Sequence, residues 1–404
     1  MSTSALEGIR VIEFGHVWAA PYCGAVLADI GAEVIKVESR ERLDVHRKQG
    51  PFPGKERGIN RSAVWNAQNR GKFGCTINLR EARGVELAKR LVARSDVVLE
   101  NYRPGVMKKL GLDYPALKLV KPDIIMVSMT GFGQTGPFSN YAAYGPMLEA
   151  FSGVASITGY PDGPPACIGE SYPDPLVGLY GVFAILVALY HRVETGQGQY
   201  IDLSQLEAMI CHLPEAILDF VLNGRTASSI GNRDEVMAPH GCYWCQGEDK
   251  WVAIAISTDA EWESFCRAIG SPDWCRDERF SDGFGRWRNQ TELDERVESW
   301  TKQHTTYEVM HILQSAGIRA GPSLNIEELL HDPHLRSRKV FVEVEHPEIG
   351  TQLTYAPTWK LHRTPGEIQR HAPLLGGDNH YVFGEVLGLS GAEIAQLIDD
   401  RVLY

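Results

Sequence analysis

Gly169-Glu170-Ser171-Tyr172-Pro173-Asp174-Pro175 is the stretch around which the chain is organised, and an apolar run from Leu176 to Tyr190 follows it. Asp174 followed by proline predicts a capped helix start, because a carboxylate accepts from first-turn N–H groups and proline has none to lose there. The run is uncharged and holds 15 residues, two of them glycine. We therefore predict a helix that is buried nearly all round and too short to span a bilayer. Its positive end would keep the carboxylate ionised and direct it toward a ligand.

Short apolar runs alternate with helical patterns over the preceding part of the chain. Runs at Arg10–Phe14, Val34–Val37, Asp96–Leu99 and Asp123–Met129 indicate buried strands, and helical spacing recurs in Pro21–Ile30, Ala82–Arg94 and Gly105–Leu119. This alternation predicts an α/β fold with a parallel sheet and right-handed crossovers. Ligands of such sheets bind outside the carboxyl ends of the strands.

Composition limits the classes of partner. The 404 residues suggest two folding units, and a formal charge of −11 argues against nucleic acid or an anionic membrane. A polyanionic ligand would need a locally basic pocket. No basic start followed by an apolar core occurs from Met1 to Phe14, so we predict no signal peptide. Eight scattered cysteines are typical of the reducing cytoplasm.

A glycine-rich segment, Gly131-Phe132-Gly133-Gln134-Thr135-Gly136, matches the dinucleotide-binding pattern and follows a predicted strand. The third glycine of that pattern should open a helix, whereas Pro137-Phe138-Ser139-Asn140 shows no helical period. We interpret the segment as a mobile loop over a pocket rather than a nicotinamide or flavin site.

A cysteine pair, Cys242 and Cys245, has the spacing of half a zinc site. No second ligand pair has that spacing, and the segment resembles the start of a hairpin, in which positions three apart lie on opposite faces. We therefore predict no metal site.

The composition changes after residue 222, where a polar, irregular stretch indicates a crossing between domains. We expect a large domain over residues 1–222, a smaller mixed α/β domain over 223–333 and a segment, 334–404, that returns to the large domain. The later elements that we predict are strands at Tyr200–Leu203, Trp251–Ile256, Val340–Val344 and Gln352–Tyr355, and helices at Gln205–Leu222, Asp259–Ile269, Leu293–Gln303, Tyr307–Ala316 and Gly391–Asp399.

Several phrases, in this order, resemble the family III CoA-transferases of the carnitine and formyl-CoA type. They are Leu6–Val11, Leu27–Glu38, Glu100–Gly105, Gly131–Pro137, Thr195–Gln199, Gly231–Arg233 and Ala238–Gly241. The resemblance runs nearly end to end. It implies a Rossmann-like large domain, a smaller domain and an interlocked homodimer, or a hetero-oligomer with a related subunit.

The resemblance also implies a mechanism, because the family's nucleophilic aspartate matches Asp174. A carboxylate can attack an acyl-CoA carbonyl to form a mixed anhydride, and the CoA thiolate can then form an aspartyl thioester. An acceptor carboxylate continues from there, and no general base is needed since each attacking group is already anionic. Backbone N–H groups of a glycine loop such as Gly131–Gly136 are candidate oxyanion donors, and the sequence leaves their identity open. CoA is a substrate here, and we expect no permanently bound cofactor.

CoA contacts carry over from the resemblance position by position. They are Trp18, Ala19, Ile77, Asn78, Leu79, Arg80, Asn101, Tyr102, Arg103, Lys109, Ala142, Ala143, Tyr144 and Gly145. Arg80, Arg103 and Lys109 would supply positive charge for the CoA phosphates. The chain departs from formyl-CoA transferase at Ser39, where that enzyme has an arginine and Arg40 is the candidate substitute.

Two further departures concern the acid that accepts CoA. Gly145 replaces an acidic residue beside the active site, and the run of four glycines in the small domain is missing, so formate and oxalate are poor candidates. The aromatic residues Trp18, Tyr144, Tyr172 and Trp244 favour a larger acceptor, such as an aryl-substituted succinate, with succinyl-CoA as donor.

Two alternatives stay open. An α-methylacyl-CoA racemase shares the fold but needs an acid–base pair with a histidine, and Tyr144 stands at the matching position. A non-catalytic subunit of a hetero-oligomeric transferase would be expected to lose the nucleophile, whereas Asp174 is present.

Overall fold

A six-stranded parallel sheet forms the centre of the computed structural model, which describes residues 4–404. Its strands are β1 (Arg10–Glu13), β2 (Glu33–Glu38), β3 (Phe73–Thr76), β4 (Val97–Glu100), β5 (Ile125–Thr130) and β6 (Tyr200–Ser204). The strand order is β3-β2-β1-β4-β5-β6, the order of the Rossmann fold. The predicted α/β class and parallel sheet are thus confirmed. Only β3 was missed, because its sequence Phe-Gly-Cys-Thr has no β-branched run.

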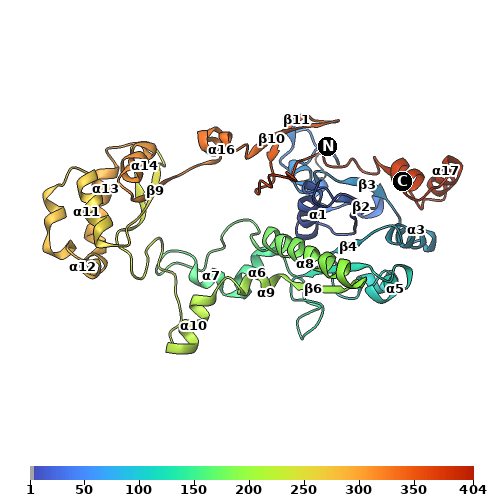
Figure 1. The fold of residues 1–404 in the computed structure, drawn as a ribbon, viewed down its shortest axis with the longest axis horizontal. Helices are drawn as coiled ribbons and strands as arrows, with labels where there is room; N and C mark the ends of the chain where they lie inside the picture. Colours follow the sequence, from blue (N-terminus) through green and yellow to red (C-terminus); the bar gives the residue numbers. More distant parts are fainter. Residues whose placement is uncertain (1–3) are drawn as a thin grey trace. The chain divides into compact units, whose positions relative to one another are not determined.

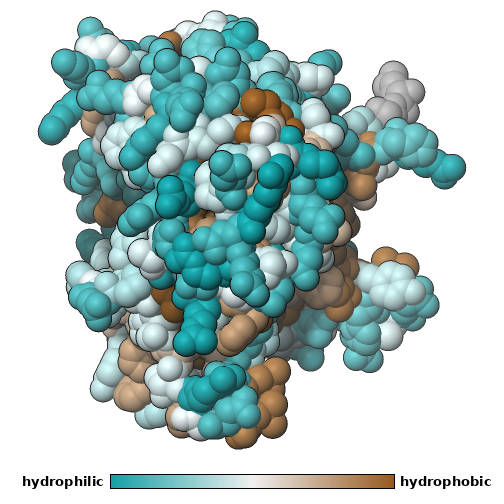
Figure 2. Space-filling model, turned by 90° about the vertical axis from the view of Figure 1, so that its left-hand side faces the viewer, coloured by the Kyte–Doolittle hydropathy of each residue, from teal (hydrophilic) through white to brown (hydrophobic). Residues whose placement is uncertain are grey.

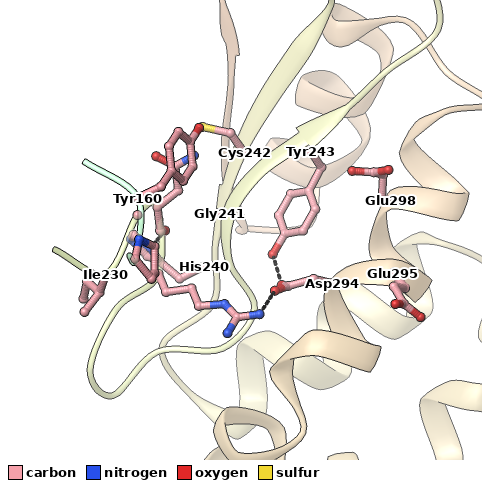
Figure 3. Close-up of a pocket in the computed structure, with 13 residues that line it drawn as sticks. Tyr160, Ile230, His240, Gly241, Cys242, Tyr243, Asp294, Glu295 and Glu298 are labelled. Carbon is pink, nitrogen blue, oxygen red and sulfur yellow. Dashed lines mark hydrogen bonds and ion pairs between the residues drawn. The ribbon is translucent and has the colours of Figure 1, made fainter. Parts of the chain in front are cut away.

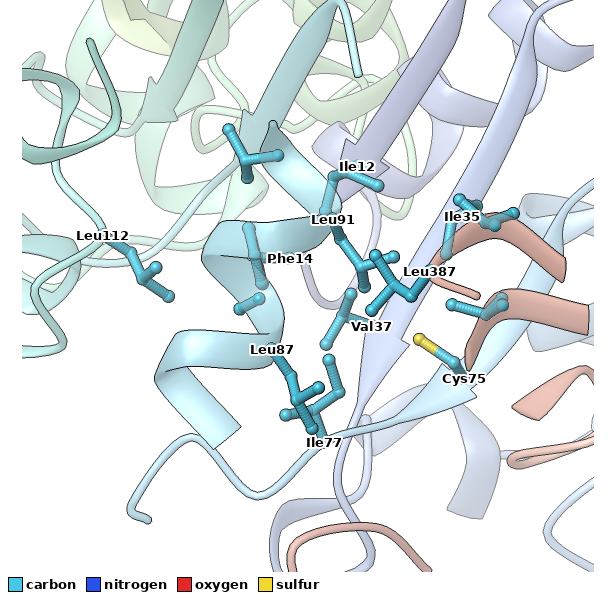
Figure 4. Close-up of a cluster of buried hydrophobic side chains, with 14 of the residues drawn as sticks. Ile12, Phe14, Ile35, Val37, Cys75, Ile77, Leu87, Leu91, Leu112 and Leu387 are labelled. Atoms are coloured by element: carbon cyan, nitrogen blue, oxygen red, sulfur yellow. The ribbon is translucent and has the colours of Figure 1, made fainter. Parts of the chain in front are cut away.

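Apolar side chains cover both faces of this sheet, since successive residues of a strand point to opposite sides. Val11 packs with α1 (Ala19–Asp29) and α8 (Pro173–Thr195) on one face. Ile12 packs on the other face with α3 (Ala82–Val92), as Figure 4 shows. Burial on both faces explains why these strands read as continuous apolar runs rather than alternating ones.

Helix α8 differs from its prediction in length and in burial. It extends over 23 residues and, by length and composition, is apolar enough to cross a membrane. Its outer face is exposed, with Phe183 at 68% and Tyr190 at 71%, so it is not buried all round. The inner face lies against α1 (Figure 1), where Gly178 and Gly181 allow close approach. A Cβ on Gly181 would lie 1.9 Å from Met129 Cε.

The C-terminal segment covers the β3 edge of the sheet. Asp378 accepts a hydrogen bond from Gly74 N at 2.8 Å, and Asn379 accepts one from Thr76 N at 2.9 Å. Phe383 and Leu403 pack into the core on the α3 face. These contacts pair N–H groups that would otherwise be free at a sheet edge.

The chain divides into two compact units. The first contains the described residues up to Ala155, Cys167–Arg225 and His334–Tyr404, and the second contains Ser156–Ala166 and Thr226–Pro333. The segment Ser156–Ala166 was not anticipated in the second unit. That unit has an antiparallel sheet of β7 (His240–Trp244), β8 (Trp251–Ala255) and β9 (Arg319–Ser323). The face drawn in Figure 2 is mostly hydrophilic, as the acidic composition leads one to expect.

Two predicted helices are each divided in the structure. Residues 105–119 form α4 (Val106–Lys109) and α5 (Tyr114–Val120), separated at Gly111, whose φ is +68°. Residues 205–222 form α9 (Gln205–Ile210) and α10 (Pro214–Asn223), because Pro214 cannot donate to the preceding turn. The remaining helices are α2 (Ala63–Asn69), α6 (Gly145–Ser152), α7 (Val154–Ile157), α11 (Asp259–Ala268), α12 (Gly283–Arg288), α13 (Gln290–Thr301), α14 (Thr306–Ser315), α15 (Ile326–His331), α16 (Pro333–Ser337) and α17 (Gly391–Asp399). The remaining strands, β10 (Phe341–His346) and β11 (Gly350–Tyr355), form a hairpin.

Short helical turns complete the list of elements. They are η1 (Arg40–Arg42), η2 (Val45–Lys48), η3 (Pro53–Lys55), η4 (Asp273–Arg276), η5 (Glu278–Phe280) and a wider π-type turn, η6 (His380–Val386). The turn η2 matters for the site described below, because it carries a buried histidine.

Candidate active site

Asp174 lies in the first turn of α8 rather than at its cap. The residue before the helix is Tyr172, and no side chain caps the helix there, so the predicted capping role is wrong. Its carboxylate instead accepts a hydrogen bond from Ser171 Oγ, and the backbone N–H of Ala19 lies near enough to lower its pKa. Ala19 opens α1, so Asp174 lies where the N-termini of α8 and α1 meet. Two helix ends favour negative charge at this point.

Opposing effects act on the pKa of Asp174. Burial raises it, while Ser171, His46 and the Ala19 N–H act to lower it, and the net pKa is above the ordinary value of an aspartate. A half-buried carboxylate with few strong partners is less solvated than one in water and therefore more nucleophilic.

The loop before Asp174 is held by a buried glutamate on α6. Glu149, which is fully buried, accepts hydrogen bonds from Ile168 N at 2.8 Å and Tyr172 N at 3.1 Å. At the start of the same helix, Gly145 leaves space for the loop. A Cβ on Gly145 would lie 1.8 Å from Ser171 Oγ and 2.8 Å from Asp174 Oδ2. The glycine that departs from formyl-CoA transferase is thus required by the local packing around Asp174.

On the other side of Asp174, the β1–α1 loop is held in a strained conformation. Val17 has a φ of +67°, which is rare for a β-branched residue. Its N–H donates to Asp44 Oδ2 at 2.9 Å, and Lys36 Nζ lies 3.9 Å from the same carboxylate oxygen. Because both Asp44 and Lys36 are fully buried, the hydrogen bond from Val17 to Asp44 is shielded from water. The strain is confined to the segment that presents the Ala19 N–H to Asp174.

A second contact set reaches the same loop from α2 and η2. The Gln68 amide nitrogen donates to Val17 O at 2.9 Å and to His46 Nδ1 at 2.6 Å, while its oxygen accepts from Trp18 Nε1 at 3.2 Å. The rings of Trp18 and His46 pack edge to face with centroids 6.2 Å apart. His46 is only 5% exposed. No sequence motif indicates His46 or Gln68, and both were missed.

A cleft of about 160 Å³ opens at the carboxyl ends of β1 to β4, where the strand order reverses. Basic side chains reach it from Arg42 and Arg80, beside the rings of His16 and Tyr102. Burial, with Lys36 nearby, lowers the pKa of His16, so this ring is neutral near pH 7. Other lining residues are Val37, Glu38, Ser39, Glu41, Ile77, Asn78, Leu79, Val106 and Leu110.

Another pocket, of about 350 Å³, lies within the second unit (Figure 3). Tyr243 donates to Asp294 Oδ1 at 2.8 Å, and Arg233 lies 3.2 Å from Asp294 Oδ2. Two phrases that carry the resemblance, Gly231–Arg233 and the His240-Gly241 end of Ala238–Gly241, line this pocket. Cys242 also lines it while Cys245 belongs to the core, so the hairpin separates the two cysteines as predicted.

Comparisons with known proteins now decide the family. A model of CoA-transferase family III matches residues 6–379. The chain belongs to CoA-transferase family III. It is 35% identical to the succinyl-CoA–D-citramalate CoA-transferase of Chloroflexus aurantiacus, over 98% of both chains. It is 32% identical to the succinyl-CoA–L-malate CoA-transferase beta subunit of that organism, over 100% of this chain and 99% of the other.

Solved structures agree. A CAIB/BAIF family protein from Brucella suis superposes with a TM-score of 0.86 at 32% identity, covering 95% of this chain and 99% of the other. The prediction of a family III CoA-transferase is therefore confirmed, and the reaction class is CoA transfer.

The CoA contacts expected for a family III CoA-transferase fall into three groups in the structure. Lining the cleft are Ile77, Asn78, Leu79, Arg80 and Tyr102. Around Asp174 lie Ala19, Gly145 and their chain neighbours Trp18 and Tyr144. Outside the lining are Asn101, Arg103, Lys109, Ala142 and Ala143.

Two of the residues outside the cleft lining, Asn101 and Ala143, make contacts that the structure defines. Asn101 exchanges two hydrogen bonds of 2.8 Å with the backbone of His16 and so shapes the β1–α1 loop. Ala143 packs against Gly131, where a Cβ would lie 2.8 Å from its own. Arg103 and Lys109 are exposed. Arg42 lines the cleft and Arg40 does not, so the basic side chain that accompanies Ser39 in the cleft lining is Arg42.

As the sequence predicts, the glycine-rich segment is not followed directly by a helix. Residues 131–144 contain no helix before α6, so the strand–turn–helix context of a dinucleotide site is missing from this described segment. The N–H of Gln134 donates to Asp202 at 2.9 Å. The backbone N–H that acts on the resting Asp174 carboxylate is that of Ala19, and the oxyanion role of Gly131–Gly136 stays a prediction.

Proposed function

We propose that this CoA-transferase works through covalent catalysis by Asp174. The observation that carries the proposal is the position of Asp174 between the N-termini of α8 and α1. Ala19, the first residue of α1, follows the cleft residue His16 by three positions, so the cleft and Asp174 share the β1–α1 loop. The carboxylate attacks the acyl-CoA carbonyl, which forms an aspartyl mixed anhydride and expels the CoA thiolate. The thiolate attacks the aspartyl carbonyl and releases the donor acid, leaving an aspartyl-CoA thioester.

The second half of the reaction uses the same groups in reverse. The acceptor carboxylate attacks the aspartyl thioester, expels the thiolate and forms a second anhydride. The thiolate then attacks the acceptor's carbonyl and regenerates the Asp174 carboxylate. When the thiolate or the acceptor attacks the aspartyl carbonyl, negative charge develops on an Asp174 oxygen, and the effect of the Ala19 N–H on the Asp174 carboxylate supports it as a donor to that oxygen.

Succinyl-CoA is the donor that we propose, and a substituted succinate is the acceptor. The names of two relatives specify succinyl-CoA together with D-citramalate or L-malate, which are substituted succinates. Gly145 removes a side chain beside Asp174, and the exposed rings of Tyr144 and Tyr172 flank the position. These rings support an acceptor with an apolar or aromatic substituent.

Asp174→Ala and Asp174→Asn test the mechanism. Both variants should fold and should lose transfer from succinyl-CoA by several orders of magnitude, because the covalent intermediate cannot form. With succinyl-CoA and hydroxylamine, only the wild type should acquire a hydroxamate on the peptide that contains Asp174, which mass spectrometry detects. Near-normal turnover by Asp174→Ala would refute covalent catalysis at this residue.

An acid panel tests the acceptor. The enzyme is incubated with succinyl-CoA and formate, oxalate, malate, citramalate or benzylsuccinate, and new thioesters are identified by mass. We expect substituted succinates to give the highest kcat/KM. A higher value for formate or oxalate than for every larger acid would contradict the proposal.

A second candidate activity is racemisation at the α-carbon of an acyl-CoA. The observation in its favour is that a histidine, His46, does lie near Asp174, although not at the predicted position of Tyr144. The measurement that separates the two activities is α-deuterium uptake into a 2-methylacyl-CoA in D₂O. A transferase takes up none, whereas a racemase exchanges the proton at every turnover.

Oligomerisation and location complete the proposal. We propose that the chain forms an interlocked homodimer or pairs with a related subunit, since one relative is named as a beta subunit. Cytoplasmic location follows from the scattered cysteines and the family.

A further inference from the structure

His46 is a buried polar residue that the proposed mechanism does not use. It lies in η2, is 5% exposed and packs edge to face against Trp18, the residue before the Ala19 donor. It also acts electrostatically on Asp174. Burying an imidazole costs free energy unless its nitrogens find partners, so the partners indicate what the ring does.

Gln68 determines which ring nitrogen carries the proton. The Gln68 amide contacts two groups whose hydrogen-bonding role cannot change. The Val17 carbonyl can only accept, and the Trp18 indole N–H can only donate. The amide must therefore turn its nitrogen toward Val17 O, and the same nitrogen faces His46 Nδ1 at 2.6 Å. His46 Nδ1 then has to accept, so the proton of the neutral ring is on Nε2.

The Nε2–H group has no acceptor among the described residues. Within residues 4–404, Gln68 at Nδ1 is the one hydrogen-bond partner of the His46 ring, while the His46 backbone N–H donates to Asp44 and its carbonyl accepts from Gln49 N. Nε2 is not among the buried polar atoms without a partner in the described chain, so its N–H reaches accessible space on the Asp174 side of the ring, where a ligand oxygen can accept from it.

We propose that His46 Nε2–H donates a hydrogen bond to the oxygen that becomes negatively charged when the Asp174 adduct is attacked, and that Gln68 is the positioning residue that keeps the proton on Nε2. This inference rests on the proposed covalent role of Asp174. With Ala19 N–H it makes a two-donor oxyanion site, built from the α1 start and η2.

Several charged or titratable groups near His46 can also affect the pH dependence of kcat. Asp174 lies toward it from α8, and Asp44 accepts its backbone N–H at 3.0 Å. Lys36 on β2 and His16 after β1 each lie 3.9 Å from Asp44. From α2 and the α1 start the neighbours are the uncharged Gln68 and Trp18.

His46→Phe is the first variant, because phenylalanine keeps a ring against Trp18 and removes the donor. Loss of one oxyanion donor costs about a hundred- to a thousandfold in kcat, so kcat for succinyl-CoA transfer should fall by that factor while KM changes little. The matched control is His346→Phe. His346, in β10, is also a buried histidine, 4% exposed, and its ring packs against that of His371. The control should keep its kcat. A kcat for His46→Phe within threefold of wild type would overturn the inference.

Gln68→Glu tests the proton position directly. A carboxylate at residue 68 accepts from Nδ1–H, so the neutral ring would present a lone pair on Nε2 and only the imidazolium would donate. The kcat of Gln68→Glu should therefore fall as pH rises through the pKa of that imidazolium, whereas wild type shows no such loss. A purely structural role for residue 68 would lower kcat equally at all pH values, which would refute the assignment.

Asp174→Ala separates the two levels of the argument. If it turns over normally, covalent catalysis is wrong, whatever His46 does. If it is inactive while His46→Phe is fully active, the Asp174 mechanism stands and the His46 donor alone is wrong.

Discussion

At the scale of the residue, the side chains of the candidate site, such as His46 and Gln68, lie in sequence contexts that carry no recognisable motif. Asp174 lies at the start of an apolar helix, as many aspartates do, and Ser171 and Ala19 are the neighbours that set the environment of its carboxylate. His46 and Gln68 belong to no pattern, yet they contact each other across η2 and α2. In the cleft, Arg42 and Arg80 provide positive charge in an acidic protein. Phosphate groups of CoA require such local charge.

Phosphate contacts predict a particular kinetic signature. Arg80→Ala and Lys109→Ala should each raise KM for acyl-CoA by about tenfold and leave kcat nearly unchanged, because these contacts are equal in ground and transition states. Both side chains are exposed, so solvent screening limits the effect. Steady-state kinetics with varied acyl-CoA measures it. Lys108→Ala, one residue away on α4, serves as the control. An unchanged KM in both test variants would exclude them from the CoA site.

At the scale of the element, the site depends on close approach of helices. Gly178 and Gly181 bring α8 against α1, and this contact places the first turn of α8 beside the first residue of α1. At the start of α6, Gly145 leaves room for the loop that carries Ser171. The fully buried Glu149 then holds that loop from the same helix. The observed position of Asp174 therefore requires small residues at these points.

Gly145→Ala tests this requirement. A Cβ 1.8 Å from Ser171 Oγ and 2.8 Å from Asp174 Oδ2 must displace both groups. We expect kcat to fall by about a hundredfold, since displacements near 1 Å cost that much, with little loss of folding. Gly169→Ala is the matched control, because no atom lies within 4 Å of its added Cβ. Thermal melting and kcat are measured together. Equal activity of the two variants would show that the space beside Asp174 is not needed.

At the scale of the whole molecule, two helices of the described chain expose large apolar side chains. On α8, Phe183, Tyr190 and Val193 are 68%, 71% and 80% exposed. Helix α10 has no buried residue, although Phe220 and Leu222 are among its apolar side chains. Contiguous apolar faces of this kind mark protein interfaces. They support the proposed dimer, which would bury them against a second chain.

Charge placed on these faces should dissociate the oligomer. Phe183→Asp and Phe220→Asp are expected to convert the protein to monomers, as measured by size-exclusion chromatography with light scattering. Leu119→Asp on α5 is the control, since Leu119 is 88% exposed and lies on a different helix. If wild type is monomeric when purified alone, mixing it with a related subunit decides whether the partner is a different chain. A monomer that stays monomeric and fully active would refute the dimer.

The sequence by itself determined the sheet, the family and the nucleophile candidate. Four of the five strands that precede α8 have strong apolar runs, because burial on both faces imposes them, and β3 lacked one. Asp174 could be identified because the family's phrases lie in order along the chain. Apolar runs and family phrases can be recognised in a sequence without knowing which segments contact one another.

Only the tertiary structure decided what surrounds Asp174. Ala19, His46 and Gln68 are more than a hundred residues from it in sequence, and no local period records which backbone N–H or ring nitrogen a fold will bring to a carboxylate. The same holds for the cap that Asp174 does not form, since its carboxylate finds better donors in a neighbouring helix and loop than in its own. Strand and helix patterns depend on burial, which a sequence displays, whereas hydrogen-bond partners depend on where separate elements meet.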